Sequence, residues 1–221
     1  MIELHAVCTD TVRRVDAEEL RRRMPERVRK AARYRQENDR LLCLGGGLLM
    51  IRALGIRDES VLSCGPYGKP FLPGEEKFFN LSHSGEWCLM AVSSRGPVGV
   101  DIEQVNEANL QVSSVVFTEA ERQWMKDEPA ERFHMLWTWK ESVMKALGLG
   151  MELEPAGFEV LPFFRGEGIR IHQKRLYAFS GRLEDYPFSV CSEEPVNELC
   201  GWEWRQTGGV FHPEPLNYIR T

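Results

Sequence analysis

The stretch from residue 130 to residue 147 constrains the fold of this 221-residue chain more than any other. Its pattern predicts one long helix that Gly148 and Gly150 end. Apolar side chains occupy two flanks of this helix: Phe133, Leu136, Trp137, Met144 and Leu147 on one, and Trp139, Val143 and Ala146 on the other. A helix that is apolar on two flanks is expected to be buried between layers of other elements. The rest of the chain must supply those layers.

The first third of the chain is predicted to be mainly helical after one strand. Alternation of apolar and polar residues over residues 4–8 predicts the strand. Asp16 followed by Glu19 resembles a capping box that opens a helix, and a second helix is expected over residues 38–54, stopped by Gly55. The glycines at positions 45–47 are poor helix formers, so we expect them to permit close packing or to break this helix.

Strands and helices alternate in the remainder. Two β-like runs, residues 87–92 and 98–105, are separated by the turn SSRGP and predict a hairpin. Thr118 and Glu121 form a second capping-box pattern before helical sequence to about residue 126. Four short β-like runs follow, at residues 158–161, 169–172, 176–180 and 188–191. Because both halves contain helix-rich and strand-rich stretches, we expect an α+β fold with two similar subdomains.

Composition narrows the function classes. The net charge is -5, yet residues 13–40 contain eleven Lys/Arg against six Asp/Glu. This pattern argues against non-specific nucleic-acid binding and favours a local anion site, although a solvated basic helix face would look the same.

Nothing in the sequence indicates a membrane or secreted protein. The first residues lack the basic start and apolar core of a signal peptide, and the nearly apolar stretch 41–51 is too short to cross a bilayer. The six scattered cysteines show neither a CxxC motif nor a Cys/His cluster, so a zinc site is not expected. We therefore expect a cytoplasmic protein with reduced thiols.

Two carboxylates share one face of the strand predicted in VGVDIEQV. Alternation along a strand places Asp101 and Glu103 together, about 7 Å apart, opposite the valines and the isoleucine. Such a pair can hold Mg²⁺, a hard cation that prefers carboxylates, water and phosphate oxygens. The solvated face of an edge strand would give the same pattern.

The long helix supplies a third acid. Glu141 and Lys145 are four residues apart and so lie on one face of the helix. If they are buried they need partners, and a metal ion with bound phosphates would serve both. A helix salt bridge worth about 0.3–0.5 kcal/mol is the alternative.

Two further segments offer groups that could bind an anion. In FNLSHSGEW, Ser82, His83 and exposed backbone amides could cradle a phosphate where a strand from Phe78 is expected to end. The alternative is a turn in which the polar side chains satisfy the backbone. In YGKP, Lys69 lies on a stiff turn, which limits the entropy that it loses on gripping an anion.

The order of these motifs is specific. YGKP, FNLSHSG, GVDIE, FTxxE and WxxKES(x)₂K resemble, in that order, the 4′-phosphopantetheinyl transferases of the larger, surfactin-synthetase-activating type. The resemblance spans about residues 24–158. It implies two similar α/β half-domains in one monomer, with coenzyme A in the cleft between them. We divide them at residues 1–100 and 101–221.

The resemblance also implies roles for individual residues. Asp101, Glu103 and Glu141 match the metal-binding acids, and we predict Glu141 and Lys145 as catalytic. The predicted coenzyme A contacts are Arg27, Lys30, Lys69, Ser82, His83 and Lys145, with Arg27 and Lys30 in a PERVRK segment that resembles the one gripping the 3′-phosphate. Leu42 and Cys43 depart from the family, which often has an Arg-Thr or Arg-Ser pair there.

The implied reaction is the Mg²⁺-dependent transfer of the phosphopantetheine arm of coenzyme A to a serine of an apo acyl or peptidyl carrier protein, releasing 3′,5′-ADP. Residues 105–117, with Leu110, Val112, Val115 and Val116, could contact the carrier or form an ordinary buried strand. A coenzyme-A-binding interaction protein without catalysis and a Mg²⁺-dependent phosphotransferase acting on a small molecule remain alternatives.

Overall fold

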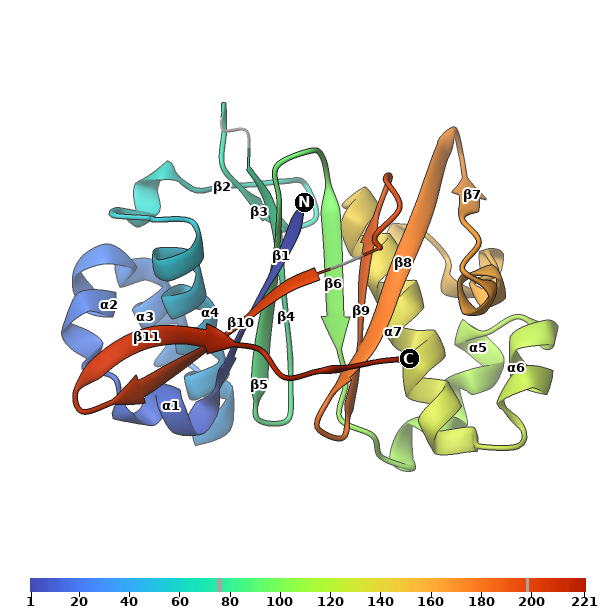
Figure 1. Cartoon of the computed structure of the whole chain (residues 1–221), viewed down its shortest axis with the longest axis horizontal. Helices are drawn as coiled ribbons and strands as arrows, with labels where there is room; N and C mark the ends of the chain where they lie inside the picture. Colours follow the sequence, from blue (N-terminus) through green and yellow to red (C-terminus); the bar gives the residue numbers. More distant parts are fainter. Residues whose placement is uncertain (75–76, 198) are drawn as a thin grey trace. The chain divides into compact units, whose positions relative to one another are not determined.

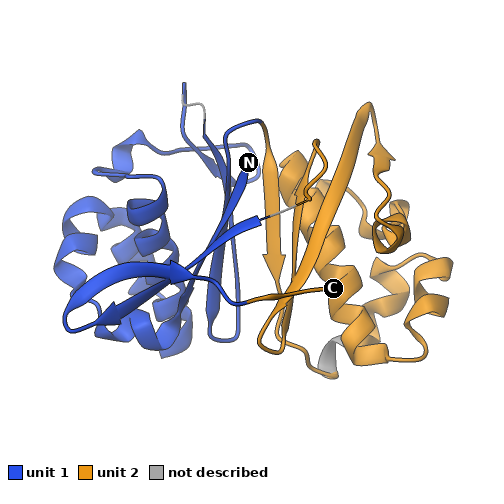
Figure 2. Ribbon diagram, viewed as in Figure 1, with its two compact units in different colours: residues 1–95, 199–217 blue, residues 96–198, 218–221 orange. Residues whose placement is uncertain are grey.

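The computed structural model of the chain describes residues 1–74, 77–197 and 199–221. The chain divides into two compact units, Met1–Arg95 with Leu199–Asn217, and Gly96–Glu198 with Tyr218–Thr221 (Figure 2). Each unit combines helices with a β-sheet, which confirms the predicted α+β class (Figure 1). None of the helices in these described ranges is both long and apolar enough to cross a membrane.

The first unit contains a five-stranded sheet in the order β11-β10-β1-β5-β4, in which only the β1–β10 pair is parallel. Its elements, with 3₁₀ turns written η, are β1 (Ile2–Cys8), α1 (Thr9–Arg14), α2 (Ala17–Arg23), α3 (Pro25–Ala31), α4 (Glu37–Ala53), η1 (Glu59–Val61), β2 (Ser63–Cys64), β3 (Pro70–Phe71), β4 (Phe78–Ser84), β5 (Trp87–Ser93), β10 (Leu199–Thr207) and β11 (Val210–Pro215).

Helix α4 forms the core of the first unit against β1 and β5 (Figure 1). The predicted helix over residues 38–54 is therefore confirmed, and the glycines at 45–47 do not break it. A Cβ atom at Gly47 would lie 2.9 Å from Leu20 Cδ2 of α2, so the glycines permit close packing. Asp16 caps α2 by accepting from the Glu18 N–H, but Glu19 pairs with Arg52 instead of completing a capping box.

The second unit is built around a sheet in the order β12-β8-β9-β6, with β7 pairing β8 at its side. Its elements are β6 (Val98–Ile102), η2 (Ala108–Val112), α5 (Ser113–Val116), α6 (Glu119–Met125), α7 (Pro129–Leu147), η3 (Gly150–Glu152), η4 (Pro155–Gly157), η5 (Leu161–Arg165), β7 (Ile169–Ile171), β8 (Lys174–Leu183), β9 (Tyr186–Ser192) and β12 (Ile219–Arg220).

Two local predictions were wrong, and one of two open alternatives is excluded. The runs 87–92 and 98–105 do not form a hairpin, because β5 pairs with β1 and β4 whereas β6 pairs with β9 in the other sheet. Residues 158–161 are not a strand, because residues 158–160 connect the 3₁₀ turns η4 and η5 and Leu161 begins η5. Residues 105–117 are not a buried strand either, since they form η2 and the short helix α5.

The compact units also differ from the predicted division into residues 1–100 and 101–221. The chain passes between the units near residue 95, but residues 199–217 belong to the first unit. The reason is that β10 adds to the sheet as a parallel neighbour of β1, with Leu199 opposite Ile2 and Glu203 opposite Ala6.

A buried ion pair organises the second unit. The side chains of Glu121 and Lys140 are both 0% exposed, and their charged atoms lie 2.8 Å apart. Glu121 also completes the predicted capping box with Thr118 and accepts from the Val160 N–H at 2.8 Å. The Lys140 ammonium donates to the carbonyl oxygens of Pro155 and Phe158. This pair therefore joins α6 and α7 to residues 155–160, which comprise η4 and the segment after it.

We predict that Glu121→Gln destabilises the protein by about 3–5 kcal/mol, because it leaves the buried Lys140 ammonium without its counter-charge. Glu119→Gln on the same helix is the matched control, since that acid is exposed and its ion pair with Arg122 contributes little. Urea unfolding of the two variants measures the difference. Equal unfolding free energies would show that the buried pair does not hold the unit together.

Candidate active site

The close approach of α7 to β6 begins at Gly99. A Cβ atom at this position would lie 2.0 Å from the Ser142 carbonyl oxygen and 2.4 Å from the Ala146 nitrogen. Only glycine allows the helix backbone to lie so close to the strand. The Ser142 hydroxyl is 2.9 Å from that of Ser189 on β9, the residue opposite Asp101 in the ladder. Helix and sheet are thus fixed in register next to Asp101.

Asp101 and Lys145 form the centre of the candidate site. The Lys145 ammonium lies 2.5 Å from Asp101 Oδ1 and 3.7 Å from Glu141 Oε2. Asp101 is buried, whereas Glu141 and Lys145 are partly exposed. Gly99 and Asp101 are two residues apart in β6 and therefore lie on the same face of the strand, the face towards α7.

Glu103 lies one residue beyond the end of β6, on the same face as Asp101. Its N–H donates to the Pro187 carbonyl oxygen at 3.0 Å, so the chain still follows β9 at this point. Alternation then directs its side chain as it directs Asp101. The negative charge of Glu103 also acts on Lys145. The structure therefore gathers Asp101, Glu103 and Glu141 around one lysine.

The electrostatics of this cluster follow from burial and charge. Burial opposes charge on Lys145, but Asp101, Glu141 and Glu103 outweigh it and raise the lysine pKa. Burial raises the pKa of Glu141, and Asp101 raises it further while Lys145 opposes the rise. Glu141 is therefore easier to protonate than an ordinary glutamate, and an added cation would relieve the repulsion between the carboxylates.

The donors of this cluster suit a magnesium ion, although no metal centre is preformed. Within the described residues, no three His, Cys, Asp or Glu side chains converge as a ready cation site. Three carboxylates nevertheless outnumber the one ammonium group among them. Oxygen donors with excess negative charge are the ligands that Mg²⁺ prefers, so the residues fit this ion.

The other predicted residues belong to the first unit. Arg27 and Lys30 lie on α3, where the Arg27 Nη1 atom donates to the Cys43 carbonyl oxygen at 3.2 Å. Burial raises the pKa of the Cys43 thiol, and the positive charges of Arg27 and Lys30 oppose this rise. Both basic residues therefore lie near the amino-terminal half of α4.

Ser82 and His83 lie inside β4, opposite Leu89 and Cys88 of β5. The predicted strand from Phe78 continues through both residues and ends at Ser84, so neither of them lies in a turn. Neighbouring strand residues point to opposite faces, and Ser82 is buried while His83 is exposed.

Lys69 lies on the tight turn between β2 and β3, as predicted. Its carbonyl oxygen accepts from the Gly65 N–H at 2.9 Å, and Gly68 supplies the positive φ angle of 78° that this turn needs.

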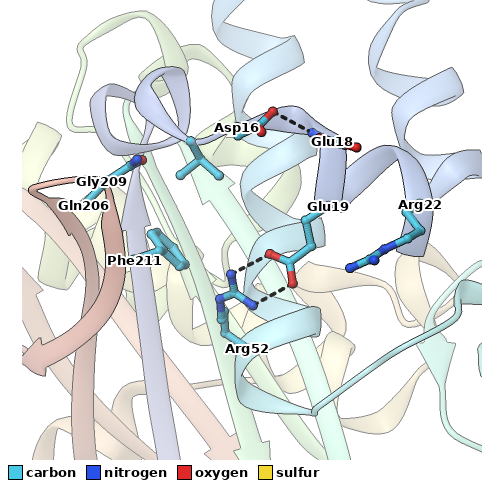
Figure 3. Close-up of a pocket in the computed structure, with 9 residues that line it drawn as sticks. Asp16, Glu18, Glu19, Arg22, Arg52, Gln206, Gly209 and Phe211 are labelled. Atoms are coloured by element: carbon cyan, nitrogen blue, oxygen red, sulfur yellow. Dashed lines mark hydrogen bonds and ion pairs between the residues drawn. The ribbon is translucent and has the colours of Figure 1, made fainter.

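A pocket of about 470 Å³ in the first unit contains none of the predicted site residues. Figure 3 shows Glu19 and Arg52 facing each other across it in a bidentate ion pair, with Arg22 nearby. Glu19 and Arg52 therefore satisfy each other's charge, and the other charged residues that line the pocket are Asp16, Glu18 and Arg22.

Sequence reasoning missed the residues that position the site rather than form it. These are Gly99, Lys140, Ser142 and Ser189. One signal was available for Lys140: Glu121 closes a capping box, and a capping acid in an apolar surrounding needs a basic partner. No local pattern marks Ser189, because its contact with Ser142 joins residues 47 apart.

The chain resembles known proteins over this region. Residues 97–191 match the family model of the 4′-phosphopantetheinyl transferase superfamily. A 4′-phosphopantetheinyl transferase of Bacillus subtilis is 30% identical over 77% of this chain and 82% of its own length. Sfp of Bacillus subtilis strain 168 is 33% identical over 62% of this chain and 65% of its own length. The 4′-phosphopantetheinyl transferase gsp of Aneurinibacillus migulanus is 37% identical over 57% of this chain and 56% of its own length.

We predict that Gly99→Ala lowers the unfolding free energy by several kcal/mol, because the new methyl group meets the backbone of α7 and cannot be relieved by a side-chain movement. Gly96→Ala, at a position with open space around it, should change stability by only about 1 kcal/mol or less. Urea unfolding of both variants tests this. A Gly99→Ala variant as stable as the control would contradict the tight packing of α7 on β6.

Proposed function

The chain belongs to the 4′-phosphopantetheinyl transferases of the Sfp type, and we propose that it transfers the phosphopantetheine arm of coenzyme A to a serine of an apo acyl or peptidyl carrier protein. The observation that carries the proposal is the cluster of Asp101, Glu103 and Glu141 around Lys145. It lies within the segment that matches the family model.

In the proposed reaction, the carrier serine oxygen bonds to the β-phosphorus of coenzyme A. The bond from this phosphorus to the bridging oxygen breaks, and 3′,5′-ADP leaves with that oxygen. Glu141 receives the serine proton, directly or through a water molecule, and its raised pKa supports this role. Positioning and neutralisation of charge supply most of the acceleration in such transfers.

Asp101, Glu103 and Glu141 would hold Mg²⁺, which when bound would neutralise charge on the phosphate oxygens. Lys145 would stabilise the developing charge beside them. In the first unit, Lys69 and the exposed His83 would contact the pyrophosphate region, and Arg27 with Lys30 would grip the 3′-phosphate. Two basic side chains one helical turn apart suit a phosphate group.

The carrier protein would dock on η2 and α5. Val112 and Val115 are 48% and 70% exposed there, which supports an apolar contact with a partner. Leu110 and Val116 instead pack into the core of the second unit, so they would support this surface from below. We also propose that the protein is a monomer and that it acts in the cytoplasm.

A transfer assay with coenzyme A, Mg²⁺ and an apo acyl carrier protein tests the proposal. A mass gain of one phosphopantetheine arm on the carrier is the expected result, and chelation of the metal should abolish it. Coenzyme A binding without transfer would favour the interaction protein. Phosphate appearing on a small molecule instead would favour the phosphotransferase.

We predict that Asp101→Asn lowers turnover in this assay about a hundredfold or more, because it removes a charge from the proposed metal site. Asp127→Asn is the control, since Asp127 is an exposed acid in the same unit that pairs with Arg132. Turnover within a few-fold of wild type for Asp101→Asn would remove this residue from the machinery.

Glu141→Gln separates the two roles proposed for Glu141. A glutamate base is inactive when protonated, so activity should fall as the pH drops through its raised pKa. The glutamine variant should lose both this acidic limb and most of the rate, and its Mg²⁺ affinity should also fall because a ligand charge is gone. Normal metal titration with a collapsed rate would assign Glu141 to proton transfer alone. A normal rate, metal titration and pH profile would leave it a structural partner of Lys145.

A further inference from the structure

The first turn of α3 is anchored by a residue from outside the helix. Met24 precedes α3 and provides no side-chain cap. The Glu59 carboxylate of η1 accepts instead from the N–H groups of Glu26, at 2.7 Å, and Arg27, at 3.2 Å. A carboxylate at a helix amino terminus is favourable for charge as well as for hydrogen bonding. The backbone of Arg27 is therefore fixed.

The side chain of Arg27 is fixed separately, by the glycines of α4. Its Nη1 atom donates to the Cys43 carbonyl oxygen, and a Cβ atom at Gly46 would lie 2.8 Å from that nitrogen. A Cβ atom at Gly47 would lie 2.9 Å from Arg27 Cδ. Gly45 points elsewhere, towards Val7 and Val12. Gly46 and Gly47 thus form a seat along which the arginine side chain lies.

The seat leaves part of the guanidinium group available. Arg27 is half-buried, and among the described residues its side chain bonds through Nη1 to Cys43. A guanidinium group presents its donors in a rigid fork, so holding one nitrogen also sets the direction of the others. Lys30 lies one turn further along α3 and is exposed. Together they offer directed donors and a second positive charge.

We propose that Gly46 and Gly47, together with Glu59, are positioning residues that orient the Arg27 guanidinium group for the 3′-phosphate of coenzyme A. This inference rests on the proposed function, in which Arg27 grips that phosphate. The seat fixes the side chain before the ligand arrives, so less conformational entropy is lost on binding. Selection of coenzyme A over 3′-dephospho-coenzyme A therefore depends on two helix glycines that need not contact the ligand.

Calorimetric titration of the full chain with coenzyme A and with 3′-dephospho-coenzyme A tests the proposal. Gly46→Ala should weaken coenzyme A binding on the order of tenfold and leave the dephospho compound nearly unchanged. Gly45→Ala is the matched control, because its methyl group faces Val7 and Val12, and it should keep the wild-type preference. Equal losses for both ligands, or an unaltered Gly46→Ala variant, would overturn the proposal.

A double-mutant cycle excludes a merely structural role. In an Arg27→Ala background, Gly46→Ala should have no further effect on coenzyme A affinity, because there is no guanidinium group left to displace. An undiminished effect would overturn the proposal. Glu59→Gln offers a second approach that leaves α4 unchanged, and it should also weaken coenzyme A selectively. Binding is measured without a carrier protein, so a wild-type chain that selects coenzyme A but fails to transfer contradicts only the proposed function.

Discussion

The second unit depends on one fully buried ion pair, Glu121 with Lys140. Burying two charges costs several kcal/mol per ion, and their attraction offsets this cost only when further hydrogen bonds complete the geometry. Here the N–H groups of Thr118 and Val160 donate to the Glu121 carboxylate. The Lys140 ammonium donates to the carbonyl oxygens of Pro155 and Phe158. Moving α6 away from α7 would leave both buried charges without their partners. The pair therefore specifies where α7 lies.

The orientation of α7 in turn determines the chemistry of the candidate site. Lys140 directly precedes Glu141, so fixing Lys140 in the core places Glu141 about 100° around the helix from it, with Lys145 one turn further along the same side as Glu141. Gly99 then brings that side of the helix onto β6, where Asp101 lies. The cluster keeps more negative than positive charge, and such a set of oxygen donors suits a cation.

Local patterns predicted the elements, whereas partners distant in the sequence decided how they assemble. A long helical run ended by glycine sufficed to predict α4 and α7, and alternation sufficed to predict the shared face of Asp101 and Glu103. The hairpin prediction failed because SSRGP has the composition of a turn whether the chain folds back or continues into another sheet. The partner of β6 lies in β9, where Val100 pairs with Val190. The residues next to Val100 in the sequence do not indicate that its partner is Val190.

The glycines of α4 show how a violated local rule can point to a function. Each glycine costs about 1 kcal/mol of helix stability relative to alanine, yet α4 continues unbroken through positions 45–47. Packing against Val7 and Val12 accounts for Gly45, the seat of Arg27 accounts for Gly46, and Arg27 together with Leu20 accounts for Gly47. Proteins break local preferences mainly where a close approach or a site requires it. The three adjacent glycines in a predicted helix were thus visible in the sequence. Only the structure identifies the arginine that lies against two of them.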